Sequence, residues 1–184
     1  KVVGLLGNWN DTLNVKQINW GINLLLEGGG TAKADGDPNY SNVGTLNAEY
    51  FFTGATANVE IKHQDAADTR PLHVAGLNIA NAKTINVSVD EGNAIIDSIN
   101  NDDASIGFVF GKDVVENLVL TSAGDVTVKG NLDIGDNAAG HLKTLDASAV
   151  AGIFTLNLTT TLLTDLSNTT VTGLDKVVFG ADHA

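Results

Sequence analysis

Hydrophobic and polar residues alternate over short stretches along this chain. The alternation is clear over 126–128 and 154–158, where Val, Phe and Leu are separated by Thr and Asn. Such alternation is typical of a β-strand that buries one face. Gly, Asn and Asp, which favour turns, gather between the stretches. The turn signals lie at 28–30, 35–39, 91–93, 100–103 and 135–137. The pattern predicts an all-β protein.

A short motif of apolar residues around an Asn or Asp recurs along the chain. Its copies are TLNV at 12–15, TLNA at 45–48, TINV at 84–87, NLVL at 117–120 and TLDA at 144–147. After several copies a second strand-like run follows, at 22–26, 57–61, 126–128 and 153–158. The last two copies align with Leu145 over Leu118. Recurring strand–turn–strand units indicate coils that stack and share one core.

We therefore predict a β-solenoid, similar to a parallel β-helix, for about residues 72–184. The first 70 residues hold six of the ten aromatic residues, which predicts a more sandwich-like or capping β portion there. A β-sandwich throughout is the alternative, because two packed sheets give the same alternation. Pro71 cannot donate a hydrogen bond to a central ladder, so we predict a boundary there. The two parts are an N-terminal β portion at 1–70 and a solenoid portion at 71–184. They form either two domains or one continuous domain.

The alternation also predicts which side chains point into the core of the solenoid portion. These are Leu118, Leu120, Val126, Val128, Leu132, Ile134, Leu145, Val150, Ile153, Leu156 and Leu158.

The composition narrows the classes of partner. The chain has 22 acidic and 10 basic residues, for a net charge of −12, so nucleic acid and anionic lipid are poor partners. No stretch is long and apolar enough for a membrane-spanning helix, so we expect no membrane insertion. An acidic surface attracts divalent cations, although acidity also serves solubility alone. The absence of Cys fits a secreted bacterial surface protein and equally a reducing compartment.

The stretch VENLVLTSAGDVTVKGNLDIGDNAAGHLKTLDASAVAGIFTLNLTTT at 115–161 resembles the repetitive β-rich regions of Gram-negative S-layer proteins and related calcium-dependent surface proteins. LKTLDASAVAG is its most characteristic element, and the likeness covers about residues 77–180. The resemblance implies a secreted, non-enzymatic protein on the bacterial cell surface that assembles into a lattice and needs Ca²⁺. One departure stands out: GGGTAKADGD at 28–37 lacks the spacing of the G-G-x-G-x-D calcium repeat, so any calcium site must be irregular.

The best candidate for that site is DGDPN at 35–39. Asp35, Asp37 and Asn39 repeat the oxygen spacing that begins an EF-hand loop, but the later ligands of such a loop are missing. An Asx-Pro turn explains the segment equally well. Asp133 and Asp136 in NLDIGDN are further turn carboxylates. Each alone fits a solvated turn, and a pair brought together by stacked coils could share an ion.

Signals for catalysis are weak. None of the four His residues has the close partner spacing of a zinc motif, although His63 and His73 flank a loop with Asp65 and Asp68. No nucleophile elbow or phosphate-binding loop occurs, so we expect no enzyme.

Three functions remain open at this stage. The first is a structural S-layer or filament-like unit that binds copies of itself, with Ca²⁺ bridging acidic turns and cell-surface polysaccharide as a second partner. The second is an adhesin or passenger-type module that binds a glycan or host ligand through Trp9, Trp20, Tyr50 and Phe51. The third is a β-helix enzyme acting on polysaccharide, which would need two acids in a groove.

Overall fold

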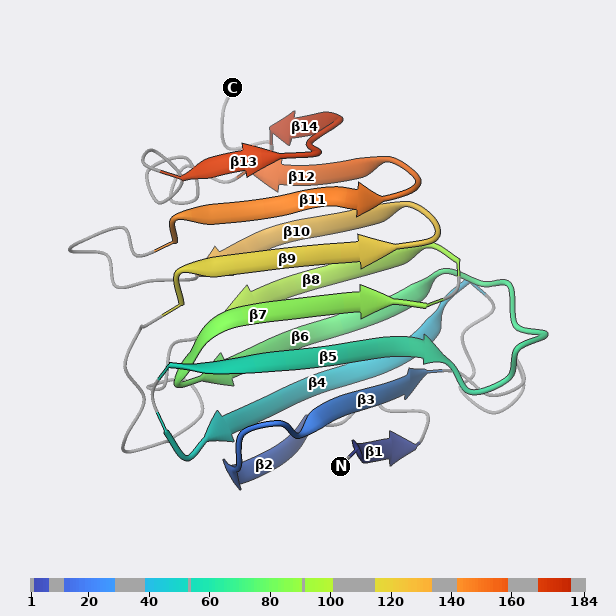
Figure 1. Ribbon diagram of the computed structural model, residues 1–184. Helices are drawn as coiled ribbons and strands as arrows, with labels where there is room; N and C mark the ends of the chain where they lie inside the picture. Colours follow the sequence, from blue (N-terminus) through green and yellow to red (C-terminus); the bar gives the residue numbers. More distant parts are fainter. Residues whose placement is uncertain are drawn as a thin grey trace.

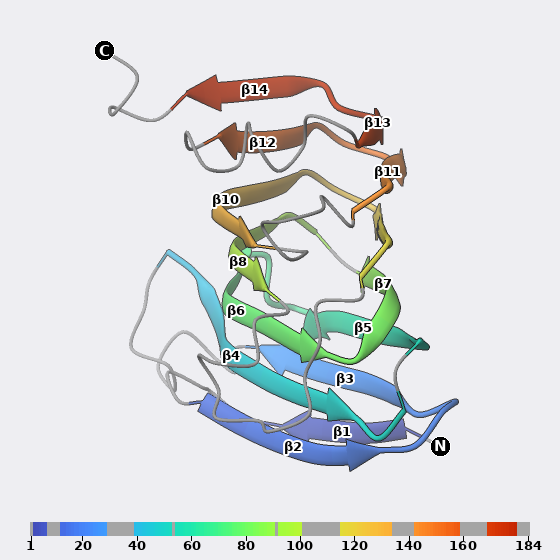
Figure 2. The same cartoon turned by 90° about the vertical axis from the view of Figure 1, so that its left-hand side faces the viewer.

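The computed structural model describes residues 2–6, 12–28, 39–52, 54–90, 92–100, 115–133, 142–158 and 169–179. Its strands form two seven-stranded sheets, which face one another as the two walls of the molecule (Figure 1, Figure 2). The chain passes from one sheet to the other after each strand, so that successive coils stack. Every pairing among the described strands is parallel, and this is the β-solenoid that the repeats predicted.

We call the two walls the odd-strand sheet and the even-strand sheet. The odd-strand sheet contains, in spatial order, β1 (Val2–Leu6), β3 (Asn23–Gly28), β5 (Ala55–His63), β7 (Ala82–Val89), β9 (Asn117–Ser122), β11 (Thr144–Val150) and β13 (Thr170–Thr172). The even-strand sheet contains β14 (Lys176–Phe179), β12 (Phe154–Leu158), β10 (Val126–Asp133), β8 (Ala94–Asn100), β6 (Leu72–Ala80), β4 (Ser41–Tyr50) and β2 (Thr12–Ile18).

The ladders run across the predicted boundary at Arg70–Pro71 without a break. β4 pairs with β6, and β5 pairs with β7, so the first 70 residues belong to the same two sheets as the rest. The solenoid therefore extends further towards the N-terminus than the sequence predicted. Parallel pairing also distinguishes this fold from the antiparallel sandwich that was the alternative.

The core lies between the sheets and is built from stacked columns of aliphatic side chains. Leu145 pairs with Leu118, as the repeat alignment predicted, and both are buried. Among the described side chains predicted to point inward, Leu120, Val126, Val128 and Leu156 are also buried, and Val150 is half-buried. The prediction for Ile153 is wrong: its side chain is 52% exposed, because it lies in the turn before β12 and not in a strand. For Leu132, Ile134 and Leu158 the structure gives no side-chain description.

Two kinds of corner join the sheets. Where the chain passes from an even to an odd strand, Gly21, Gly54 and Asn81 adopt left-handed conformations, with φ of 74°, 90° and 67°. Where it passes back, Asn and Asp side chains tie one coil to the next. The Asn93 side-chain oxygen accepts from the backbone N–H of Asp125 at 2.9 Å, and the Asp125 carboxylate accepts from that of Ile153 at 2.8 Å. Corner hydrogen bonds of this kind set the stacking distance of the coils.

Candidate functional site

The predicted calcium residues fall mostly outside the described part of the chain. Asp35, Asp37 and Asp136 lie outside it, as do Trp9 and two of the four His residues. Asn39 is an exposed residue of the bend before β4, and Asp133 is the last residue of β10. The even strands are parallel, so the residues at the start of β4 and at the end of β10 lie at opposite ends of the strands. Within the described ranges no group of three or more His, Cys, Asp or Glu side chains gathers to hold a metal.

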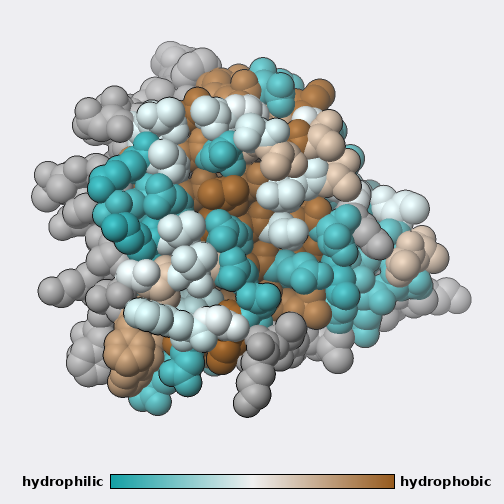
Figure 3. All heavy atoms as spheres, in the orientation of Figure 1, coloured by the Kyte–Doolittle hydropathy of each residue, from teal (hydrophilic) through white to brown (hydrophobic). Residues whose placement is uncertain are grey.

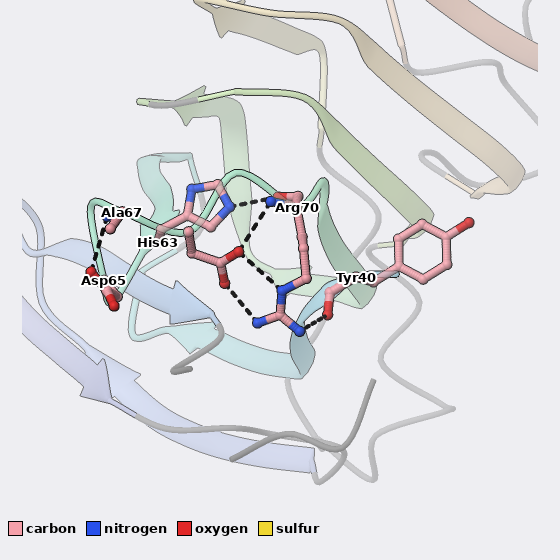
Figure 4. A network of polar contacts seen from close by, with 6 residues as sticks. Tyr40, His63, Asp65, Ala67 and Arg70 are labelled. Carbon is pink, nitrogen blue, oxygen red and sulfur yellow. Dashed lines mark hydrogen bonds and ion pairs between the residues drawn. The ribbon is translucent and has the colours of Figure 1, made fainter. Parts of the chain in front are cut away.

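The loop between His63 and His73 forms a structural clamp (Figure 4). The Arg70 guanidinium donates to both carboxylate oxygens of Asp68, at 3.0 and 2.7 Å, and to the Tyr40 carbonyl at 2.9 Å. The His63 Nε2 atom lies 2.7 Å from the Arg70 carbonyl, so it carries the proton that this hydrogen bond needs. The loop's carboxylates thus bind its own arginine and backbone, and they do not join the two histidines in a site.

The Arg70 guanidinium also holds the pKa of Asp68 down, to about 2, chiefly through the side-chain hydrogen bonds. Both side chains are largely buried, at 7% exposed for Asp68 and 12% for Arg70. The carboxylate is therefore ionised at neutral pH and contributes to stability there.

His73 belongs to a second polar cluster, on the outer face of the even-strand sheet. Its Nδ1 atom lies 2.9 Å from the side-chain oxygen of Asn42, and its Nε2 atom 2.7 Å from the Asp97 carboxylate. Lys129 reaches the other carboxylate oxygen of Asp97 at 3.3 Å, as an ion pair without hydrogen-bond geometry. These side chains link four neighbouring strands, from β4 to β10.

Three exposed aromatic side chains meet at the corner of the first coils. Trp20 contacts Phe52 edge-to-face with ring centroids 5.6 Å apart, and Phe51 contacts Phe52 in the same way at 4.6 Å. They are 51–65% exposed and lie just after the ends of β2 and β4. Of the aromatic residues predicted as a ligand platform, Trp20 and Phe51 are thus exposed, whereas Tyr50 is fully buried and belongs to the core.

Ladders of Asn side chains run along the solenoid axis on both outer faces. On the even-strand sheet Asn78 donates to Asn47, and Asn47 donates to Asn14, each at 2.7 Å. On the odd-strand sheet Asn86 donates to Asn58 at 2.8 Å, and Asn58 to Asn23 at 3.1 Å. The recurring Asn of TLNV, TLNA and TINV was the sequence signal for these ladders. Each bond joins two coils, so the repeated Asn serves the stacking of the fold.

The Asn ladder of the odd-strand sheet ends after β7. Val119, Asp146 and Thr172 follow Asn86 in the same column, and a hollow of about 410 Å³ lies beside this column. The hollow lies on the face that Figure 3 shows, where pale and teal residues surround brown ones. Its lining is Thr84, Asn117, Val119, Thr144, Asp146, Thr170 and Thr172.

A ridge of charged residues borders this hollow at the start of the odd strands. Glu116 pairs with Lys83 at 3.3 Å and with Lys143 at 2.8 Å. Lys83 is the second residue of β7, and Glu116 and Lys143 directly precede β9 and β11. The hydrogen bond from Lys143, together with that from Lys83, lowers the pKa of Glu116. The ridge thus carries alternating charges along the solenoid axis.

At both ends of the described stack, side chains of the core columns are partly exposed. One inward column ends at Val177 in β14, whose side chain is 38% exposed. The preceding members of the column are at most 1% exposed; they are Ile96, Val128 and Leu156. At the other end Leu13 of β2 is half-buried, whereas its pairing partner Leu46 is buried. Solenoids normally need terminal units with a polar outer face. Apolar side chains therefore reach both ends of the described stack.

Comparison with known proteins gives no match among protein families, curated proteins or solved structures. In the described part of the chain no helix is long and apolar enough to cross a membrane.

Proposed function

We propose that this chain is a structural unit of a bacterial cell-surface assembly, an S-layer or a filament, in which copies join end to end. The observation that carries the proposal is the exposed apolar side chain of Val177 in β14, which continues a buried column at the end of the described stack. Among the described strands, β13 and β14 lie at one end of their sheets, and β1 and β2 lie at the other. Strands at a sheet edge present backbone groups that a further strand can pair.

The polarity of the coils defines how copies would join. All strands of one sheet run in the same direction, so the edge formed by β13 and β14 matches the edge formed by β1 and β2 of a second copy. Such a contact uses two different surfaces. It is therefore heterologous and repeats into an open filament unless its rotation closes a ring.

Charge favours a role for Ca²⁺ in this assembly. Copies with a net charge of −12 repel one another, and a divalent cation reduces that repulsion. The described residues supply no calcium cage, so this part of the proposal rests on the net charge and on the acidic turns of the sequence. The extracellular location rests on the resemblance of residues 115–161 to S-layer regions.

Light scattering with electron microscopy of the same sample, across a Ca²⁺ titration and back with chelator, tests the function. Reversible growth into fibres or sheets at millimolar Ca²⁺, with Mg²⁺ much weaker, is the expected result. A monomer indifferent to both ions would contradict the proposal. It would favour the ligand-binding alternative, whose supporting observation is the exposed cluster of Trp20, Phe51 and Phe52.

A further inference from the structure

The hollow on the odd-strand sheet is open to solvent, and we call it the groove. It crosses β7, β9, β11 and β13, four neighbouring parallel strands. Strands in a sheet lie about 4.8 Å apart, so the lining from Thr84 to Thr170 extends about 14 Å along the solenoid axis. Its volume of about 410 Å³ lies in the range of small-ligand sites. The groove is therefore long enough for several units of a linear oligomer.

The lining combines hydroxyl, amide and carboxylate groups with one aliphatic side chain. The Thr144 hydroxyl donates to the Asn117 side-chain oxygen at 2.7 Å, and the Asn117 amide donates to Thr84 at 3.2 Å. These bonds orient the column and leave the Thr84 hydroxyl hydrogen and the second amide hydrogen of Asn117 as donors to a ligand. Val119 stands in the middle of the groove and is half-buried, so it offers apolar contact there.

Asp146 supplies a fixed acceptor in the groove. Its Oδ1 atom accepts from the Ser148 backbone N–H at 2.9 Å, the Ser148 hydroxyl at 2.6 Å and the Thr172 hydroxyl at 2.8 Å. These hydrogen bonds, led by that from the Ser148 side chain, lower the pKa of Asp146. All three use the same oxygen, so the second oxygen of the ionised carboxylate is available to a donor on a ligand.

These groups suit a ligand that is rich in hydroxyls and carries no charge. A sugar ring presents hydroxyl groups to the Thr, Asn and Asp side chains and a C–H face to Val119. Polyanions are disfavoured by Asp146 and by the net charge of −12. An extended peptide would bind best by pairing with the backbone of an edge strand, whereas the groove is lined by side chains on the face of the sheet.

We propose that this groove binds a neutral oligosaccharide along the solenoid axis. The binding uses side chains on the face of the odd-strand sheet, whereas end-to-end assembly would use strand edges and core columns; the two regions meet at β13. Asp146 would accept hydrogen bonds from sugar hydroxyls, Thr84 and Asn117 would donate to sugar oxygens, and Val119 would pack against a ring.

Titration of the isotope-labelled chain by NMR, with neutral tetrasaccharides of glucose, mannose, galactose or N-acetylglucosamine as probes, tests the proposal. We expect one of them at millimolar concentration to shift the amide signals of β9, β11 and β13. A heparin tetrasaccharide, as the anionic comparison, should shift them much less. Val119→Trp would fill the groove and weaken the binding at least tenfold. The matched control Thr127→Trp, on the outer face of the even-strand sheet, should leave the affinity unchanged.

Three results would overturn the proposal. The first is that none of the four neutral probes changes the chemical shifts of groove residues. The second is that the changes are confined to the corner of Trp20 and Phe52. The third is that the two Trp variants weaken the binding affinity equally. Asp146→Asn gives a second measure, because it keeps the shape of the side chain and removes the charge; we expect a several-fold loss of affinity. Sedimentation of the same samples reports assembly separately, so failure of this site and failure of the proposed function are distinguishable.

Discussion

The Asn ladder of the even-strand sheet can be tested at its central member. Asn47 accepts a hydrogen bond from Asn78 and donates one to Asn14, and it is only 6% exposed. Replacement by Ala removes both bonds and leaves a donor on Asn78 without its partner. A side-chain hydrogen bond contributes about 1 kcal/mol net, and a buried group left unsatisfied costs about 1–3 kcal/mol. We therefore expect Asn47→Ala to lower the free energy of unfolding by about 2–3 kcal/mol.

Thermal and urea unfolding measure this loss. For a chain of this length, 1 kcal/mol corresponds to roughly 2–4 °C in Tm, so Asn47→Ala should unfold about 4–12 °C below the parent chain. The matched control is Asn58→Ala in the ladder of the odd-strand sheet, whose side chain is more exposed and has one longer bond, at 3.1 Å. Its loss should be smaller, about 1 kcal/mol.

A double-mutant cycle isolates the bond between coils. Asn78→Ala alone removes one donor, and the coupling between positions 47 and 78 should be about 0.5–1.5 kcal/mol. A loss below about 0.5 kcal/mol for Asn47→Ala, or additive effects in the cycle, would refute the view that the Asn ladder holds the coils together.

Three further predictions concern single residues of the fold. Asp68→Asn should lower the free energy of unfolding by about 2 kcal/mol at pH 7, because the folded pKa of Asp68 is about 2 and its usual value is 3.8. This stabilisation is present above pH 4 and is lost as the pH falls towards 2. Urea unfolding of the parent and the variant should therefore converge near pH 2, and a constant difference would contradict the prediction. Gly152→Ala should destabilise the chain by more than about 2 kcal/mol in urea unfolding, because its Cβ would lie 2.6 Å from the Asp125 backbone nitrogen. Gly21→Ala meets open space and should cost only about 1 kcal/mol, because residue 21 has a left-handed conformation. Equal losses for the two variants would refute the crowding at Gly152. Burial raises the pKa of Tyr50 to about 12, so the free energy of unfolding should fall as the pH rises from 10 towards 12. In a spectrophotometric titration, Tyr50→Phe should remove the phenol transition at the higher pH. Loss of a transition near pH 10 instead would contradict the assignment.

The fold was predictable because its coils repeat the same apolar columns. Alternation over 126–128 and 154–158 identified the strands, and the alignment of Leu145 with Leu118 gave their register. The N-terminal coils were harder to recognise, since the motif changes sheets between copies. TLNV and TLNA lie in the even-strand sheet, whereas TINV, NLVL and TLDA lie in the odd-strand sheet. A single series of copies therefore mixes two walls and gives an irregular spacing.

The candidate sites were less predictable, because they depend on which columns become neighbours. The groove arises where Val119 and Asp146 replace Asn in one column, and this column is visible only once the register of β7, β9 and β11 is known. The spacing of DGDPN predicted a local calcium turn, and the described residues do not test it. Asp133 and Asn39 are both turn-associated in sequence, yet parallel strands separate them across the sheet.

We propose that copies join end to end through the apolar columns at the ends of the described stack. Sedimentation velocity of the 184-residue chain at increasing protein concentration, with Ca²⁺ present, tests it most directly when Val177→Asp and Val178→Asp are compared. Both variants place one charge on β14, but Val177 continues the buried inward column and Val178 pairs with Asn157 on the outward face. The account predicts growing particles for the parent chain and Val178→Asp, and a monomer for Val177→Asp. A monomeric parent chain at every concentration, or assembly that Val177→Asp leaves intact, would contradict it.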